Sequence, residues 1–212
     1  MLKINRDKLE EGLMLTGRNA TSFEGKAIRL GVHSFNNHNA MVVRASRLAI
    51  NELEECGELL PGHGIKPGDF CIAEAKPPMS TLTSIEDYED IINKEKYLVR
   101  FYRLKTLDED QRIKASEYFV DYLLRKPYPK KRRMILLAFP IYNILIDNKI
   151  LPLPPIRLTW CSQLDKDAFT SQDPHCLDGI DGKQKELFTP KTFDNRVLFG
   201  IFEDLTDTII VK

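Results

Sequence analysis

The sequence predicts an α+β fold in which a small antiparallel sheet packs against helices, and two patterns support this. Short runs of β-branched, aromatic and alternating residues recur in the first half of the chain and predict strands. A long amphipathic pattern over 107–126 predicts a helix. The 212 residues, of which 42% are hydrophobic and 29% charged, suffice for one full core. We therefore expect a single domain over residues 1–212.

Strands are expected on both sides of a long loop in the first third of the chain. The first strand is predicted over Leu9–Leu15, and 27–35 is helical or irregular. The apolar run after His38 predicts a buried strand over 38–45. Residues 51–69 are predicted to form a loop insertion. The residues that indicate the loop are Pro61, Gly62, Gly64, Pro67 and Gly68.

Strand and helix signals alternate in the middle of the chain. Phe70–Ala75 is predicted to be a strand that Pro77 ends. A short helix is expected over 84–93, with Ser84 as its cap and Asp87 at the capping-box position. Residues 97–104 alternate like a strand, and the helix over 107–126 follows them.

The last third of the chain gives fewer regular signals. The apolar run Met134–Ile146 predicts a buried helix or strand, because it is too short to span a membrane and Pro140 interrupts it. The stiff segment Leu151–Pro155 is either a rigid connector or a wall of a substrate groove. Residues 170–212 are expected to form a C-terminal extension, with strand-like runs over 197–202 and 208–211.

Charge and cysteine content exclude several classes of protein. Lys plus Arg equals Asp plus Glu at 31 each, so nothing predicts nucleic-acid binding. The four cysteines are too scattered for a disulfide scaffold, and they predict no metal site. The N-terminus lacks the apolar core of a secretory signal, so a cytoplasmic location without stable membrane insertion is expected. The oligomeric state stays open.

A candidate nucleophile stands where a β-prone run changes to a helix pattern. Cys161, Leu164, Asp165 and Ala168 fall on one helix face that starts at the sulfur. The free N–H groups and the positive end of a helix stabilise a thiolate at that position. Such surroundings lower a cysteine pKa from about 8.5 to roughly 3.5–7.5. The simpler alternative is a small buried cysteine without chemistry.

A base and an orienting group are available on two separate strands. His38 begins one strand, and Glu74 lies among small and apolar residues on another. Together with Cys161 they are the residue types of a thiol-hydrolase triad. The alternatives are a strand-edge histidine with ordinary partners and a Glu74 that faces solvent. A buried carboxylate needs a partner, and an imidazole ring is one.

The order of these segments resembles the circularly permuted NlpC/P60 hydrolases, a YaeF/YiiX-like group with a permuted papain fold. That family has an entry strand, a histidine strand, an "EA" strand, a tyrosine segment and an "(F/Y)CSEL" helix. The matching segments are Leu9–Leu15, His38–Val43, Ile72–Ala75, Lys126–Pro129 and Trp160–Leu164. Three positions differ from the family pattern: Glu11-Gly12 stands in place of Pro-Gly-Asp, Pro129 in place of Asp, and Gln163 in place of Glu.

The resemblance implies a papain-like cysteine peptidase, amidase or acyl hydrolase. Cys161 would attack the substrate, His38 would act as base, and Glu74 would orient His38. Tyr128 and Trp160 would line the substrate site, and no metal or organic cofactor is implied. The substrate would be a small molecule, a lipid or a peptide. The alternative is a catalytically inactive binding module on the same fold.

The residues around the expected site favour an acyl or lipid-type amide over a cell-wall peptide. Trp160, Tyr128 and the run Met134–Ile146 would give the groove an apolar border. The basic run Lys130–Arg133 is either a solvated face or a rim of this groove that suits an anionic head group.

Overall fold

The protein is built around a six-stranded antiparallel sheet with helices on both faces. The fold was obtained as a computed structural model, which describes residues 1–18, 38–76, 78–94, 98–127, 161–178 and 200–211. The strand order is β5-β4-β3-β2-β6-β7, and every pair of neighbours is antiparallel. The strands of this sheet are β2 (Met14–Arg18), β3 (His38–Arg44), β4 (Phe70–Lys76), β5 (Met79–Ser84), β6 (Leu98–Leu104) and β7 (Phe202–Asp204). This arrangement confirms the predicted α+β class.

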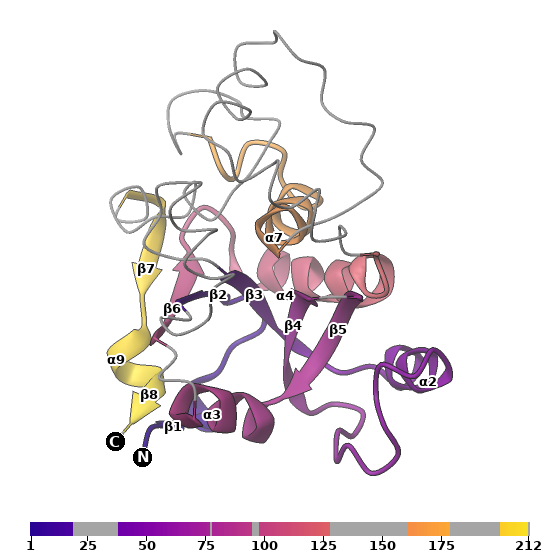
Figure 1. The fold of residues 1–212 in the computed structure, drawn as a ribbon. Helices are drawn as coiled ribbons and strands as arrows, with labels where there is room; N and C mark the ends of the chain where they lie inside the picture. Colours follow the sequence, from indigo (N-terminus) through magenta and orange to yellow (C-terminus); the bar gives the residue numbers. More distant parts are fainter. Residues whose placement is uncertain (19–37, 77, 95–97, 128–160, 179–199, 212) are drawn as a thin grey trace, which may run out of the picture.

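A separate two-stranded sheet joins the two ends of the chain. It pairs β1 (Lys3–Ile4) with β8 (Ile210–Val211). The N- and C-termini therefore lie close together (Figure 1). The helical elements are the short η1 (Arg6–Lys8), α2 (Arg47–Glu55), α3 (Ile85–Lys94), α4 (Glu109–Tyr118) with its π-helical continuation η2 (Phe119–Leu123), α7 (Cys161–Thr170) and α9 (Thr206–Ile209).

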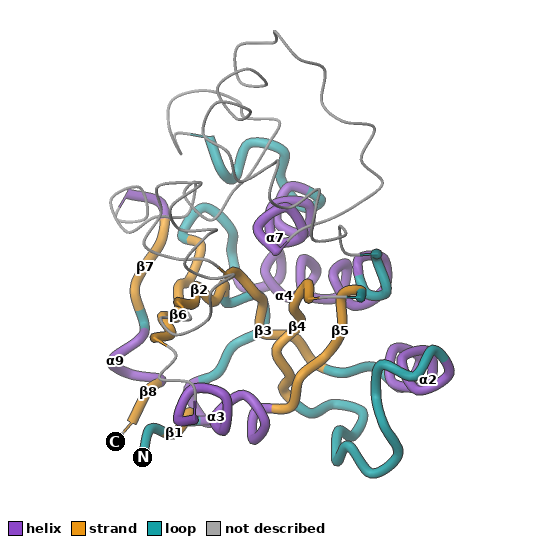
Figure 2. Tube along the Cα trace, in the orientation of Figure 1, coloured by secondary structure: helices purple, strands orange, loops and turns teal. Residues whose placement is uncertain are grey.

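Helices cover the two faces of the sheet unequally, as the tube view shows (Figure 2). α7 and α4 pack against each other and against β3, whereas α3 packs near the chain termini. Alternate residues of β3 therefore enter two separate core layers. Met41 and Val43 pack in the layer that contains α2, α4 and α7. Ala40 and Val42 pack in the layer that contains α3.

Side-chain caps mark the starts of two helices, α3 and α4. The Ser84 hydroxyl accepts from the backbone N–H of Asp87 at 3.0 Å, as the predicted cap requires. Asp108 and Gln111 form a reciprocal capping box at the start of α4. The helix predicted over 107–126 is confirmed in position, although its last turns are π-helical.

Two predictions in the first third of the chain are wrong in part. The first strand begins at Met14 rather than at Leu9, because Gly12 turns the chain with a φ of 72°. The predicted loop over 51–69 begins with a helix, since α2 continues to Glu55. Ser46 caps that helix and Leu53 is fully buried, so local packing outweighs the glycines and prolines that follow.

The chain ends differently from the prediction. The segment expected as a strand over 208–211 begins inside α9, and only Ile210–Val211 is extended. Of the strand expected over 197–202, residues 200–201 are helical and Phe202 is the first residue of β7, whereas 197–199 lie outside the described residues. The run Met134–Ile146 and the segment Leu151–Pro155 lie outside the described residues. In the part of the chain that is described, no helix has the length and apolar character needed to cross a membrane.

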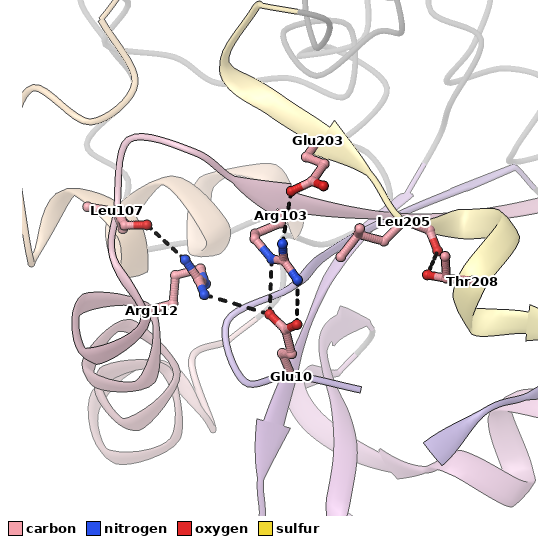
Figure 3. A network of polar contacts seen from close by, with 7 residues as sticks. All are labelled: Glu10, Arg103, Leu107, Arg112, Glu203, Leu205 and Thr208. Carbon is pink, nitrogen blue, oxygen red and sulfur yellow. Dashed lines mark hydrogen bonds and ion pairs between the residues drawn. The ribbon is translucent and has the colours of Figure 1, made fainter. Parts of the chain in front are cut away.

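A network of ion pairs connects the turn before β2 with β6, β7 and α4 (Figure 3). Arg103 on β6 pairs with Glu10 in the turn and, at 2.9 Å, with Glu203 on β7. Arg112 on α4 lies 3.6 Å from the Glu10 carboxylate and donates to the Leu107 carbonyl at 2.8 Å. These contacts fix the turn that leads into β2, the strand beside β3.

Candidate functional site

His38 begins β3 and lies against Glu74 of the neighbouring strand. Glu74 is the cross-strand partner of Ala40, and His38 lies two residues before Ala40. Side chains two residues apart project from the same face of a sheet, so register brings the two together. The His38 Nε2 atom is 2.9 Å from the Glu74 Oε2 atom. The predicted approach of Glu74 to this ring is therefore present.

Glu74 is buried and held by a second strand neighbour. Its side chain is 7% exposed. Its other oxygen, Oε1, accepts a hydrogen bond from the Thr83 hydroxyl on β5. Thr83 lies two residues beyond Thr81, the direct cross-strand partner of Glu74, so it occupies the same face. Both carboxylate oxygens have a partner, which satisfies the condition for burying a carboxylate.

Cys161 is the first residue of α7, as the sequence predicts. The helix face formed by Cys161, Leu164, Asp165 and Ala168 is buried. α7 packs against β3, and Cys161 is one of the two groups that raise the pKa of His38, so the sulfur and the ring are neighbours. Because Nε2 faces Glu74, Nδ1 is the ring nitrogen left for the sulfur.

The His38 ring connects the two core layers at one end of the sheet. Cys161 belongs to the layer that contains α4 and α7. Glu74 is paired with Ala40, which belongs to the layer that contains α3. His38, the first residue of β3, pairs with Glu74, and Cys161 also raises its pKa.

The charge state of His38 follows from these neighbours. Burial lowers the pKa of His38, but the interactions with Cys161 and Glu74 raise it by a larger amount. The net result is a pKa of about 10 instead of 6.5. His38 therefore carries its proton at neutral pH, and the imidazolium lies beside Glu74 and Cys161.

The other thiols have surroundings that do not favour a nucleophile. Burial and nearby carboxylates raise the pKa of Cys71 and of Cys176 to about 12 in each case. Cys56 is exposed, and its thiol donates to the Leu53 carbonyl at 3.4 Å. In the described residues, Cys161 is the thiol that has a histidine partner.

Asn39 does not take the place of Glu74. It is fully buried, and its Nδ2 atom donates to the Met14 sulfur at 3.7 Å. His63 and His175 pair with Glu54 and Asp178, away from the cysteine. Two predicted lining residues, Tyr128 and Trp160, lie outside the described residues, and so does Lys130–Arg133.

Sequence reasoning missed two residues beside the triad. Thr83 lies on β5, a strand that was not predicted, although the alternation of Thr81 and Thr83 after two prolines was its signal. Asp165 lies on the helix face of Cys161, but the sequence alone does not show that its carboxyl oxygens lack a partner among the described residues. A carboxylate on an otherwise apolar helix face is itself a signal, because burying it is unfavourable.

Comparison with known proteins leaves the family of this chain unassigned. No family model matches the chain, and no curated protein matches its sequence. Among solved structures, the fold is similar to that of metalloprotein YiiX from Escherichia coli O157:H7 (DUF1105). The TM-score is 0.49 and the identity 15%, over 92% of this chain and 95% of that chain. A likeness of this degree assigns neither family nor activity.

The described residues offer no evident metal centre. They contain no group of three or more His, Cys, Asp or Glu side chains arranged to hold a metal ion. A cavity of about 530 Å³ lies elsewhere, between Arg44, Phe70 and the start of α3. The candidate functional site in the described residues is therefore the cluster of Cys161, His38 and Glu74.

Proposed function

We propose that this protein is a cysteine hydrolase that cleaves an amide or acyl bond. The observation that carries the proposal is the position of His38 between Glu74, at 2.9 Å, and Cys161 at the start of α7. This arrangement supplies a nucleophile, a base beside it, and a carboxylate that orients the base, as hydrolysis by a cysteine requires.

The first half of the reaction would proceed from the ion pair. The Cys161 thiolate attacks the substrate carbonyl, and the backbone N–H of Cys161 at the helix start donates to the developing oxyanion. The His38 imidazolium gives its proton to the leaving amine or alcohol, and a thioester to Cys161 remains.

The second half returns the site to its starting state. Neutral His38 takes a proton from water, the water oxygen attacks the thioester, and the acid product leaves as the thiolate reforms. Glu74 keeps the ring oriented through Nε2 in both halves. Thr83 restrains Glu74 in turn.

We propose an acyl or lipid-type amide as the substrate class. Pro129 and Gln163 stand where the resembling family has carboxylates, which makes the surroundings less suited to a cationic amine. Gln163 donates to Asp167 at 2.7 Å along α7. Cell-wall peptides carry several charges and would need paired polar groups along a groove.

The test is a paired assay of the wild type with Cys161→Ala and, as a matched control, Cys56→Ser. Short acyl esters and amides form one substrate set, and γ-linked and D-amino-acid dipeptides form the other. We expect cleavage of the acyl set that is lost in Cys161→Ala and kept in Cys56→Ser. Cleavage of the peptides alone would overturn the substrate class, and cleavage that persists in Cys161→Ala would overturn the nucleophile.

The burial of Cys161 favours one alternative, a non-catalytic binding module on the same fold. The residue is only 5% exposed, so a substrate needs an opening to reach the sulfur. A binding module would cleave neither substrate set. It would also retain its fold in Cys161→Ala, because alanine fills most of the space of a buried thiol.

A further inference from the structure

A second buried carboxyl group lies beside the proposed catalytic pair. Asp165 is fully buried. Neither of its carboxyl oxygens has a hydrogen-bond partner among the described residues. Buried carboxyls in folded proteins are almost always paired, so an orphan at this place calls for a physical explanation.

Helix geometry places Asp165 over the nucleophile. It follows Cys161 by four residues on α7, and side chains in a helix lean toward its N-terminus. The carboxyl group of residue i+4 therefore lies over the turn that begins at residue i. The charges on Cys161 and on His38 both change the pKa of Asp165 in this structure.

Several charged groups on the elements packed against α7 have partners of their own. α7 packs against β3, β4, α4 and η2. Arg44 on β3 pairs with Glu11, Glu74 on β4 pairs with His38, and Arg112 on α4 pairs with Glu10. Asp121 on η2 and Cys71 on β4 are not among the groups whose charge acts on Asp165. Within the described chain, His38 is the cation whose charge acts on Asp165.

The Cys161 sulfur and the Asp165 carboxyl are therefore two buried groups whose negative charges oppose each other. We propose that Asp165 is a positioning residue that sets the thiolate fraction of Cys161, because a negative charge on its carboxyl disfavours a negative charge on the sulfur. One proton is shared between them. Cys161 thiolate with a protonated Asp165 is one state, and Cys161 thiol with an Asp165 carboxylate is the other.

Electrostatics agree with this competition. Burial raises the pKa of Asp165 well above its ordinary value, the charge on Cys161 raises it further, and the charge on His38 lowers it. The inference rests on the proposed function for its importance, but it concerns the protonation of the site and not turnover.

The first test compares Asp165→Asn with Asp167→Asn. Asp167 is a matched control on the same helix, since its carboxylate accepts from Gln163 and its neighbouring charges do not include Cys161 or His38. Thiolate ultraviolet absorbance is titrated in each variant, and the Cys161→Ala form of each is subtracted. We expect the Cys161 thiolate to appear at lower pH in Asp165→Asn than in the wild type and in Asp167→Asn. An unchanged or higher midpoint overturns the proposal.

The second test needs no substitution at Asp165. The infrared C=O band of a protonated buried carboxylic acid is measured at neutral pH in the wild type and in Cys161→Ser, whose hydroxyl does not ionise. We expect the band in the wild type and its loss in Cys161→Ser, because Asp165 can ionise once no anionic sulfur opposes its charge. A missing band in the wild type, or one that persists in Cys161→Ser, overturns the proposal.

The two proposals can fail separately. A shifted thiolate titration without cleavage of any substrate contradicts the hydrolase function and leaves the role of Asp165 intact. Cys161-dependent cleavage with an unshifted titration contradicts the role of Asp165 and leaves the hydrolase function intact.

Discussion

At the residue scale, the Glu74 carboxylate is held by two neighbours on one face of the sheet. His38 lies at one oxygen and Thr83 donates to the other. We expect Glu74→Gln to keep the shape of the site and to remove the charge that orients and stabilises the imidazolium. The predicted result is a fall in kcat of about 10²–10⁴-fold, the usual contribution of a positioned acid–base pair. KM should change little, since Glu74 is not expected to touch substrate.

Steady-state kinetics on the acyl substrate check this prediction. Glu86→Gln is a suitable control, because Glu86 is an exposed carboxylate that pairs with Arg6 away from the cysteine. A Glu74→Gln enzyme with wild-type kcat would remove Glu74 from the proposed triad.

His38 also makes the stability of the protein depend on pH. Its folded-state pKa of about 10 lies above the unfolded value of 6.5, so protonated His38 stabilises the fold. That stabilisation is fully present below pH 6.5 and is lost as the pH rises through about 10. Urea unfolding of the wild type and of His38→Gln should therefore give a difference in unfolding free energy that shrinks between these pH values. The exposed His175→Gln should show no such trend, and a constant difference for His38→Gln would contradict the assignment.

At the element scale, the helices and strands with strong local signals were predictable. The sequence located β3, β4, β6, α3 and α7 to within a few residues, because capping residues and apolar periodicity act over short distances. It placed the start of β2 wrongly, since Gly12 makes a turn inside an apolar run. It missed β5, whose short threonine-rich run gains its stability from pairing with β4.

The three residues of the proposed triad could be picked out from the sequence, but their contacts could not. Cys161, His38 and Glu74 are far apart in sequence, and local patterns carry no information on which strands become neighbours. Their order resembles that of a known family, and that resemblance suggested the grouping. The contacts with Thr83 and Asp165 required the register of β4 with β5 and the packing of α7.

Gly12 offers a test of how the turn before β2 is built. Its φ is 72°, and an added Cβ would come within 2.5 Å of the Arg112 carbonyl oxygen. We expect Gly12→Ala to lower the unfolding free energy by about 1–3 kcal/mol from the strained backbone alone, with a further loss from the clash. Gly57→Ala isolates the backbone cost, because Gly57 has a φ of 78° and no atom lies within 4 Å of an added Cβ. Equal losses in denaturant unfolding of the two variants would show that the contact with α4 is unimportant.

At the scale of the whole molecule, the two chain ends are part of the core. Ile4 on β1 and Ile209 on α9 are buried in the layer that contains α3. The Asn93 side chain on α3 accepts from the Leu2 backbone N–H and donates to the Leu2 carbonyl, both at 2.9 Å. These contacts tie both ends to a layer that also contains Ala40 and Val42 of β3. We therefore expect the described parts of the chain to unfold as one domain.

Ile209→Ala tests this expectation from the end of the chain. The residue is fully buried, so its truncation should lower the unfolding free energy by about 2–5 kcal/mol. Unfolding is followed by far-ultraviolet circular dichroism and by the fluorescence of Trp160, the sole tryptophan, which precedes Cys161 in the sequence. If the chain is one cooperative domain, both probes should give the same loss of unfolding free energy. The control is Val211→Ala, which truncates a side chain that is 41% exposed and should change stability little. A fluorescence midpoint that stays at its wild-type value while the circular dichroism midpoint moves would contradict the single domain. The segment next to Cys161 would then unfold independently of the sheet.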